Sequence, residues 1–168
     1  MLLNFNSSFH CMGLEGNMIK IMVSTIGHQR GPDGIVEKVD HQTEGQYYFR
    51  NGKHYIKYCD DSLTKDDSVR TTLKTDGGDF FVFRRGAVDT DMRFSLGKTT
   101  STLYRTPYSM MEMKISTKRL AIDIGEATGQ VDLCYDMAVN DTLVGEYELQ
   151  IKIIPSACKQ AAPPGAPR

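Results

Sequence analysis

Residues 46–58, QYYFRNGKHYIKY, contain the clearest β-hairpin pattern in the chain and indicate the fold class. Asn51-Gly52 separates two segments rich in Tyr, Phe and Ile. A two-residue type I′ turn favours Asn-Gly because both of its central residues need a positive φ. Asn140-Asp141 has the same position between two later segments. The sequence therefore predicts antiparallel strands joined by tight turns.

Turn residues recur on both sides of this hairpin, at intervals of about 9 to 14 residues. The segments between them are rich in Thr, Val, Ile, Tyr and Phe and alternate with period two, as in residues 131–137. No segment has a convincing helical period of 3.6 residues. We therefore predict an all-β fold, an antiparallel up-and-down β-barrel of about 8–10 strands, because a meander of this length must hide its edges. A two-sheet sandwich is the alternative.

The chain length, 168 residues and 18.8 kDa, fits one domain. Regular alternation begins abruptly near Met18 and ends near Ile154, so residues 18–154 are predicted to form a single barrel domain. Residues 1–17 have neither period and are predicted to be a poorly ordered N-terminal extension. Residues 155–168 are rich in Pro and Ala and are predicted to be a disordered tail.

The net charge and the targeting signals limit which partners and which location we expect. The chain has 20 Lys and Arg against 21 Asp and Glu, a net charge of −1, which argues against broad binding of nucleic acid or anionic membranes. No apolar stretch approaches the ~20 residues of a membrane-spanning helix. The N-terminus lacks the basic start of a signal peptide, and the four cysteines are widely scattered. We therefore expect a cytoplasmic protein with no nucleic-acid or membrane partner.

Catalytic and metal-binding motifs are missing from the sequence. The paired carboxylates at residues 60–61 and 66–67 lack the register of a calcium loop, and no Walker lysine or nucleophile elbow is present. The histidines have no metal-ligand spacing; they are His10, His28, His41 and His54. The sequence thus predicts no metal, no cofactor and no catalytic residue, and it gives no basis for assigning an enzyme activity.

The order of motifs between Glu44 and Ile153 resembles the YwiB-like family of small uncharacterised bacterial proteins. The most specific motifs are Arg85-Gly86 and the YRTPY segment of residues 104–108. The others are EG at 44–45, NGKHY at 51–55, TTLK at 71–74, MRF at 92–94, TKRL at 117–120 and the closing strand at 145–151. The resemblance implies a calycin-type, lipocalin-like β-barrel. It implies no activity, and therefore no residue role.

A barrel of this size can enclose one small molecule. We expect a small, partly apolar or amphipathic ligand with an anionic or polar end, because the planar guanidinium of arginine binds carboxylate and phosphate bidentately. Adjacent strand residues point to opposite faces, so at most one of Arg84 and Arg85 can point inward. The candidate ligand-binding residues are Arg84, Arg85, Arg93, Tyr104, Arg105, Tyr108 and Glu112.

The alternative function is a protein-interaction or homo-oligomerisation module, for example a homodimer, with no small ligand. Its candidate surface is an apolar outer patch of Met110 with Phe80 or Val82. Base stacking of nucleic acid on exposed Tyr and Arg residues is a weaker alternative because of the net charge. An enzyme is weaker still, since it rests only on analogy with other barrels.

Overall fold

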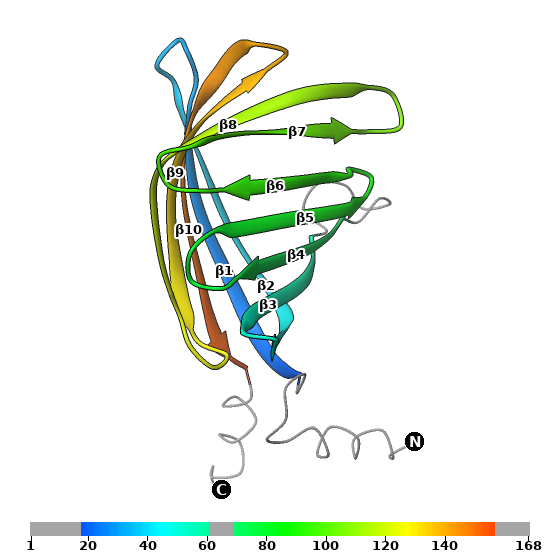
Figure 1. Ribbon diagram of the computed structural model, residues 1–168, viewed down its shortest axis with the longest axis vertical. Helices are drawn as coiled ribbons and strands as arrows, with labels where there is room; N and C mark the ends of the chain where they lie inside the picture. Colours follow the sequence, from blue (N-terminus) through cyan, green and yellow to red (C-terminus); the bar gives the residue numbers. More distant parts are fainter. Residues whose placement is uncertain (1–17, 61–68, 157–168) are drawn as a thin grey trace, which may run out of the picture.

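The computed structural model describes residues 18–60 and 69–156, which form ten antiparallel strands in one sheet (Figure 1). The neighbour order in the sheet is β6-β5-β4-β3-β2-β1-β10-β9-β8-β7. The predicted all-β, up-and-down barrel is therefore confirmed. The strands are β1 (Ile19–Arg30), β2 (Val36–Arg50), β3 (Lys53–Asp60), β4 (Val69–Thr75), β5 (Phe80–Gly86), β6 (Thr90–Phe94), β7 (Thr99–Arg105), β8 (Met110–Ile124), β9 (Gly129–Val139) and β10 (Thr142–Pro155).

Both predicted hairpin turns have the left-handed backbone that their sequences favour. Asn51 and Gly52 have φ values of 53° and 75°, and the turn joins β2 to β3. Asn140 and Asp141 have φ values of 49° and 68° between β9 and β10. These values are typical of type I′ turns, whose twist matches that of the flanking strands.

The long strands β1, β2, β8, β9 and β10 form a curved wall, and the shorter β3–β7 lie across its open side (Figure 1). Alternate residues of each strand point into the barrel, as the period-two pattern predicts. In β10 the inward residues Leu149, Ile151 and Ile153 alternate with Glu148 and Lys152, which are exposed. The core includes Ile21, Val23, Tyr47, Ile56, Leu73, Phe80, Phe94, Ile115, Val131, Leu133, Ile151 and Ile153.

The barrel is nearly closed, because the end strands β6 and β7 meet without a continuous ladder. Asp89 and Arg105 exchange two backbone hydrogen bonds of 2.9 Å. Beyond this bridge, the Thr100 hydroxyl donates to the Arg93 carbonyl over 2.6 Å. The sheet is therefore continuous everywhere except at this seam.

The first strand begins at Ile19 and the last ends at Pro155. β10 extends to Pro155, and the Ser156 amide donates to the Lys20 carbonyl over 3.0 Å, so these two residues belong to the barrel wall. The predicted N-terminal extension, residues 1–17, and residues 157–168 of the predicted tail lie outside the described residues. Within residues 18–60 and 69–156, no helix is long and apolar enough to cross a bilayer.

One predicted outer surface is wrong. Phe80 and Val82 are 0% and 5% exposed and point into the core, so they cannot form an outer patch with Met110. The aromatic residues that point outward from this strand are Phe81 and Phe83, which are half-buried. The apolar character of both faces is evident in the sequence, but which face lies inside depends on how the sheet closes.

Candidate functional site

A cavity of about 190 Å³ lies inside the barrel, next to the C-terminal half of β5. It is lined by residues of β1–β5, β9 and β10. Leu73, Val82, Leu149 and Ile151 supply apolar walls, while Arg84 brings the positive charge among the lining residues that point inward. At about 30 Å³ for each water of liquid, this volume corresponds to roughly six waters. The cavity therefore suits a small molecule.

Arg84 is the centre of an inward polar row that crosses three strands. Its register partners are Thr71 on β4 and Thr90 on β6. Side chains directly opposite one another on one sheet face have Cβ atoms about 5 Å apart. Thr71 and Thr90 are only 1% and 2% exposed, and among the described residues neither hydroxyl has a hydrogen-bond partner. Two buried hydroxyls therefore flank the guanidinium-bearing side chain with unused hydrogen-bonding capacity.

The half-buried Arg84 guanidinium has no carboxylate within salt-bridge distance in the described part of the chain, although other arginines on β5 and β6 do. Instead it lies within electrostatic range of the Tyr135 phenol. A partly desolvated cation without an anionic partner is unfavourable on its own, and a ligand anion would relieve that cost. This arrangement has the chemistry of an anion site.

Two stacked tyrosines form the wall opposite β5. The Tyr135 and Tyr147 rings have centroids 5.2 Å apart and planes 8° apart. Burial raises the pKa of the Tyr135 phenol above its ordinary value of 10.0, and the Arg84 charge only partly opposes this shift. Burial also raises the pKa of Tyr147. Both phenols therefore stay protonated at neutral pH, and each can donate a hydrogen bond.

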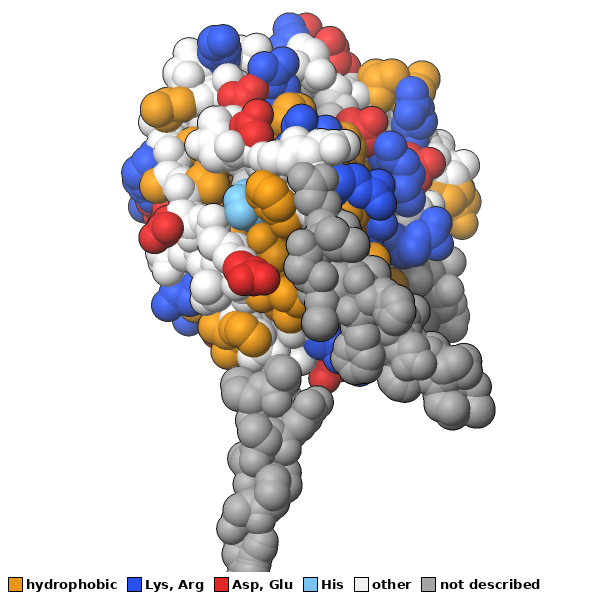
Figure 2. Space-filling view, turned by 60° about the horizontal axis from the view of Figure 1, so that its bottom comes forward, with side chains coloured by type: hydrophobic (Ala, Val, Ile, Leu, Met, Phe, Trp, Pro, Cys, Tyr) orange, Lys and Arg blue, Asp and Glu red, His pale blue; other side chains and the backbone are white. Residues whose placement is uncertain are grey.

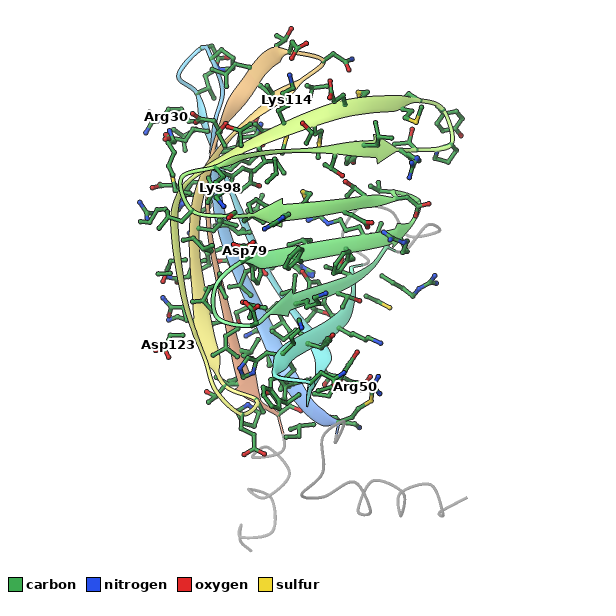
Figure 3. The ribbon with its side chains drawn as sticks, viewed as in Figure 1. Arg30, Arg50, Asp79, Lys98, Lys114 and Asp123 are labelled. Carbon is green, nitrogen blue, oxygen red and sulfur yellow. The ribbon has the colours of Figure 1, made fainter. Side chains whose placement is uncertain are left out.

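The arginines proposed from the sequence are distributed over both faces of the sheet. Arg84 points inward and Arg85 outward, as parity requires, and Arg85 pairs with Asp91 at 2.6 Å. Arg93 also points outward and donates two hydrogen bonds to Asp79, which Figure 3 labels at the β4–β5 turn. Arg105 is exposed at the β6–β7 seam. The structure thus brings only one of the four into the cavity.

The remaining sequence candidates lie on or near β8, away from the cavity. Tyr104 is partly buried and packs against the hydrophobic core. Tyr108 is 94% exposed in the turn before β8. Glu112 is exposed, and its backbone amide donates to the Asn140 side chain over 3.1 Å. None of these three side chains lines the cavity.

Sequence reasoning does not select the other polar residues around Arg84, which are Thr71, Thr90, Tyr135 and Tyr147. Threonine and tyrosine are common on strands, so their identity alone carries no signal. The register of β4 with β5 places Thr71 beside Arg84. That register is a long-range feature, and the pattern within either strand does not fix it.

Two other expectations concern metals and thiols. Among the described residues, no group of three or more His, Cys, Asp or Glu side chains could hold a metal ion. Most of the loop with the paired carboxylates, residues 61–68, lies outside that part of the chain. Cys134 is 6% exposed, and burial raises the pKa of its thiol, as expected for a structural cysteine.

Comparisons with known proteins agree with this barrel. The family model described as a domain of unknown function (DUF1934) matches residues 21–151. The uncharacterized β-barrel protein YwiB of Bacillus subtilis (strain 168) is 36% identical over 110 residues, which cover 65% of this chain and 75% of that protein. The crystal structure of the ywiB protein from Bacillus subtilis superposes with a TM-score of 0.74 and 28% identity, covering 83% of this chain and 93% of that chain. The chain therefore belongs to the YwiB-like family of β-barrel proteins, the DUF1934 family.

Proposed function

We propose that the protein binds a small, partly apolar organic anion inside a lipocalin-like barrel, with Arg84 holding the anionic group. The observation that carries this proposal is the inward, half-buried guanidinium without a carboxylate partner among the described residues. The buried hydroxyls of Thr71 and Thr90 flank it and have no partner in the described part of the chain. Charge-assisted hydrogen bonds from such groups would orient a carboxylate or phosphate.

The apolar part of the ligand is expected to lie along the opposite wall. Leu149 and Ile151 of β10 form one side of the cavity, and the stacked Tyr135 and Tyr147 rings form another. A planar or short aliphatic body fits this lining better than a sugar, which would leave its hydroxyls without partners against the aliphatic walls. The volume of about 190 Å³ favours a body no larger than a single ring or a short chain.

Adjacent arginines on β5 give the experiment a matched control. Arg84→Met removes the inward cation, whereas Arg85→Met removes the outward cation that pairs with Asp91. Isothermal titration with benzoate, hexanoate and phenyl phosphate as probes should show binding of at least one anion to the wild type. Arg84→Met is expected to weaken that binding about tenfold or more, and Arg85→Met to leave it within about twofold.

A neutral analogue tests the anionic requirement. Benzyl alcohol should bind the wild type much more weakly than benzoate does. In Arg84→Met the affinities for the two compounds should be closer to each other. Equal binding of acid and alcohol would contradict the proposal. So would the failure of all three probes combined with native mass spectra of freshly purified protein that show no retained small molecule.

The second candidate function is homo-oligomerisation, favoured by exposed apolar side chains along the β7–β8 hairpin. Leu103, Tyr108 and Met110 are 39%, 94% and 63% exposed. A shared apolar contact there would bury them between two copies. Light scattering should then give a dimer that Leu103→Ser with Met110→Ser converts to a monomer, and a monomeric wild type would exclude this function.

We also propose that the protein works in the cytoplasm. The supporting observation is that Cys59, an exposed residue, and Cys134 are free thiols. Fractionation of cells that produce the full chain should recover it with a cytoplasmic marker, and recovery from the medium would contradict this location.

A further inference from the structure

The outer face of β2–β6 carries a row of residues that combines aromatic rings with positive charges. The in-register partners across the five strands are Tyr48, Tyr55, Lys74, Phe81 and Arg93. With neighbouring strands about 4.8 Å apart, this row extends about 19 Å. The next outward row brings Lys57 and Phe83 beside it. We call these residues, together with Arg70, the aromatic–basic face.

Cations lie over the rings on this face. The Lys74 ammonium is 5.1 Å from the centroid of Phe81 and 5.7 Å from that of Phe83. Lys57 is 5.3 Å from the Tyr48 ring. The Phe81 and Phe83 rings are parallel within 5°, with centroids 6.0 Å apart. Half-buried rings in this arrangement leave flat surface next to fixed positive charge.

Three cations of the face have no anionic partner in the described part of the chain. Lys57, Arg70 and Lys74 have no carboxylate within salt-bridge distance there, whereas Arg85 and Arg93 each have one. An outer groove of about 830 Å³ is lined by Lys57, Arg70 and Lys74, together with Tyr48, Tyr55 and Phe83. Figure 2 shows Lys and Arg side chains gathered on the right of the view, the side on which β4 begins and β5 ends in Figure 1.

We propose that the aromatic–basic face binds single-stranded nucleic acid. Unpaired bases stack on flat aromatic side chains without regard to sequence, while Lys and Arg contact the phosphates between them. The net charge of −1 does not oppose this, because it is a sum over the whole chain. On the outer face of β8–β10, carboxylates pair with Lys118 and Arg119. The three cations of β3 and β4 named above have no such partner in the described part of the chain.

The rings distinguish this ligand from an acidic peptide. An acidic peptide requires only the cations, whereas a single strand uses the cations and all four aromatic residues. Duplex DNA is a poor fit because its bases are already stacked and offer only their edges in the grooves. The face is on the opposite side of the sheet from Arg84, so this inference does not depend on the interior ligand.

Fluorescence anisotropy of end-labelled oligothymidylate and oligouridylate with the full chain tests the proposal. Binding should weaken with salt, and the double variant K57Q/K74Q should reduce the slope of log K against log salt by about 0.7 for each phosphate that is no longer neutralised. The matched control K38Q/K152Q removes the same charge from the outer faces of β2 and β10. It should leave the slope unchanged.

Aromatic variants test the stacking separately from the charge. Phe83→Leu keeps an apolar side chain but removes the ring, and it should weaken binding about tenfold at an unchanged salt slope. Tyr48→Leu provides a second such variant on a different strand, so a folding defect in β5 would not leave the test undecided. Wild-type protein that fails to bind either oligonucleotide would overturn the proposal. So would competition by polyglutamate as effective as that by unlabelled oligonucleotide, which indicates an acidic protein partner, or equal affinity for duplex DNA.

Discussion

The two ends of strands β4, β5 and β6 have opposite interiors. At one end, Thr75, Phe80 and Phe94 are in register and buried, and His54 of β3 continues the row. At the other end, four residues along each strand, Thr71, Arg84 and Thr90 form the corresponding row. We call these the packed row and the polar row. They are separated by only about 13 Å of strand.

The threonines show what separates the two rows. The Thr75 hydroxyl donates to the Asp79 carbonyl over 2.7 Å and accepts from the Gly77 amide over 3.0 Å. The equally buried Thr71 hydroxyl has no partner in the described part of the chain. The packed row thus satisfies its polar groups within the protein. The polar row leaves buried hydroxyls without a partner in the described part of the chain, which lowers the stability of the empty barrel.

The largest effect should come from breaking the packed row. Phe80→Ala removes a side chain that is 0% exposed and contacts Phe94, with ring centroids 6.2 Å apart. We expect the free energy of unfolding to fall by about 3–5 kcal/mol, because burial is lost and a cavity remains. Urea unfolding measures this. Phe83→Ala on the outer face is the control and should lower the free energy of unfolding clearly less. Equal losses of unfolding free energy would show that the inner and outer faces contribute equally to stability.

Threonine-to-valine changes should have smaller effects, of opposite sign in the two rows. Thr71→Val keeps the shape of the side chain and removes a buried hydroxyl without a partner in the described chain, so we expect a gain of about 1 kcal/mol in unfolding free energy. Thr75→Val should instead lose about 1–2 kcal/mol because the Gly77 amide loses its acceptor. Urea unfolding of both variants gives the signs. A loss for Thr71→Val would show that its hydroxyl stabilises the fold.

The smallest effect concerns pH at the packed row. The Tyr47 hydroxyl and His54 Nδ1 are 2.9 Å apart, and burial lowers the pKa of His54 from 6.5. The unfolded chain therefore takes up this proton at a higher pH than the folded chain does. The contribution to stability is present above pH 6.5 and is lost as the pH falls through the lowered folded pKa.

Urea midpoints measured at neutral pH and again below pH 6.5 test this linkage. His54→Gln should remove this part of the pH dependence, while His28→Gln, at an exposed position, should retain it. If His54→Gln has the same pH dependence of stability as the wild type, His54 is not the group that causes it.

Much of the barrel could be predicted from local sequence. The Asn51-Gly52 and Asn140-Asp141 turns depend only on which residues tolerate a positive φ, and both have the expected geometry. The opposite directions of Arg84 and Arg85 follow from strand parity alone. Most of the candidate site could not be predicted from the sequence. Adjacent strands carry Thr and Tyr at many positions, and only the register between strands places particular residues beside Arg84.

Bulges limit parity arguments further. The register of β8 with β9 shifts between Thr117 and Arg119. Before the shift Met113 and Ile115 are the inward residues, and after it Leu120 and Ile122 pack against the core. A strict alternation carried across Lys118 would assign one half of this strand to the wrong face.

Sequence patterns alone were enough to predict the all-β class, the tight turns and the family. These features depend on local backbone preferences and on patterns within single segments. The closed sheet was needed to show that Arg84, and not Arg85, lies inside, and that Thr71, Thr90 and Tyr135 surround it. Closure defines which face of a sheet is inside, and closure depends on the register between strands that are distant in sequence.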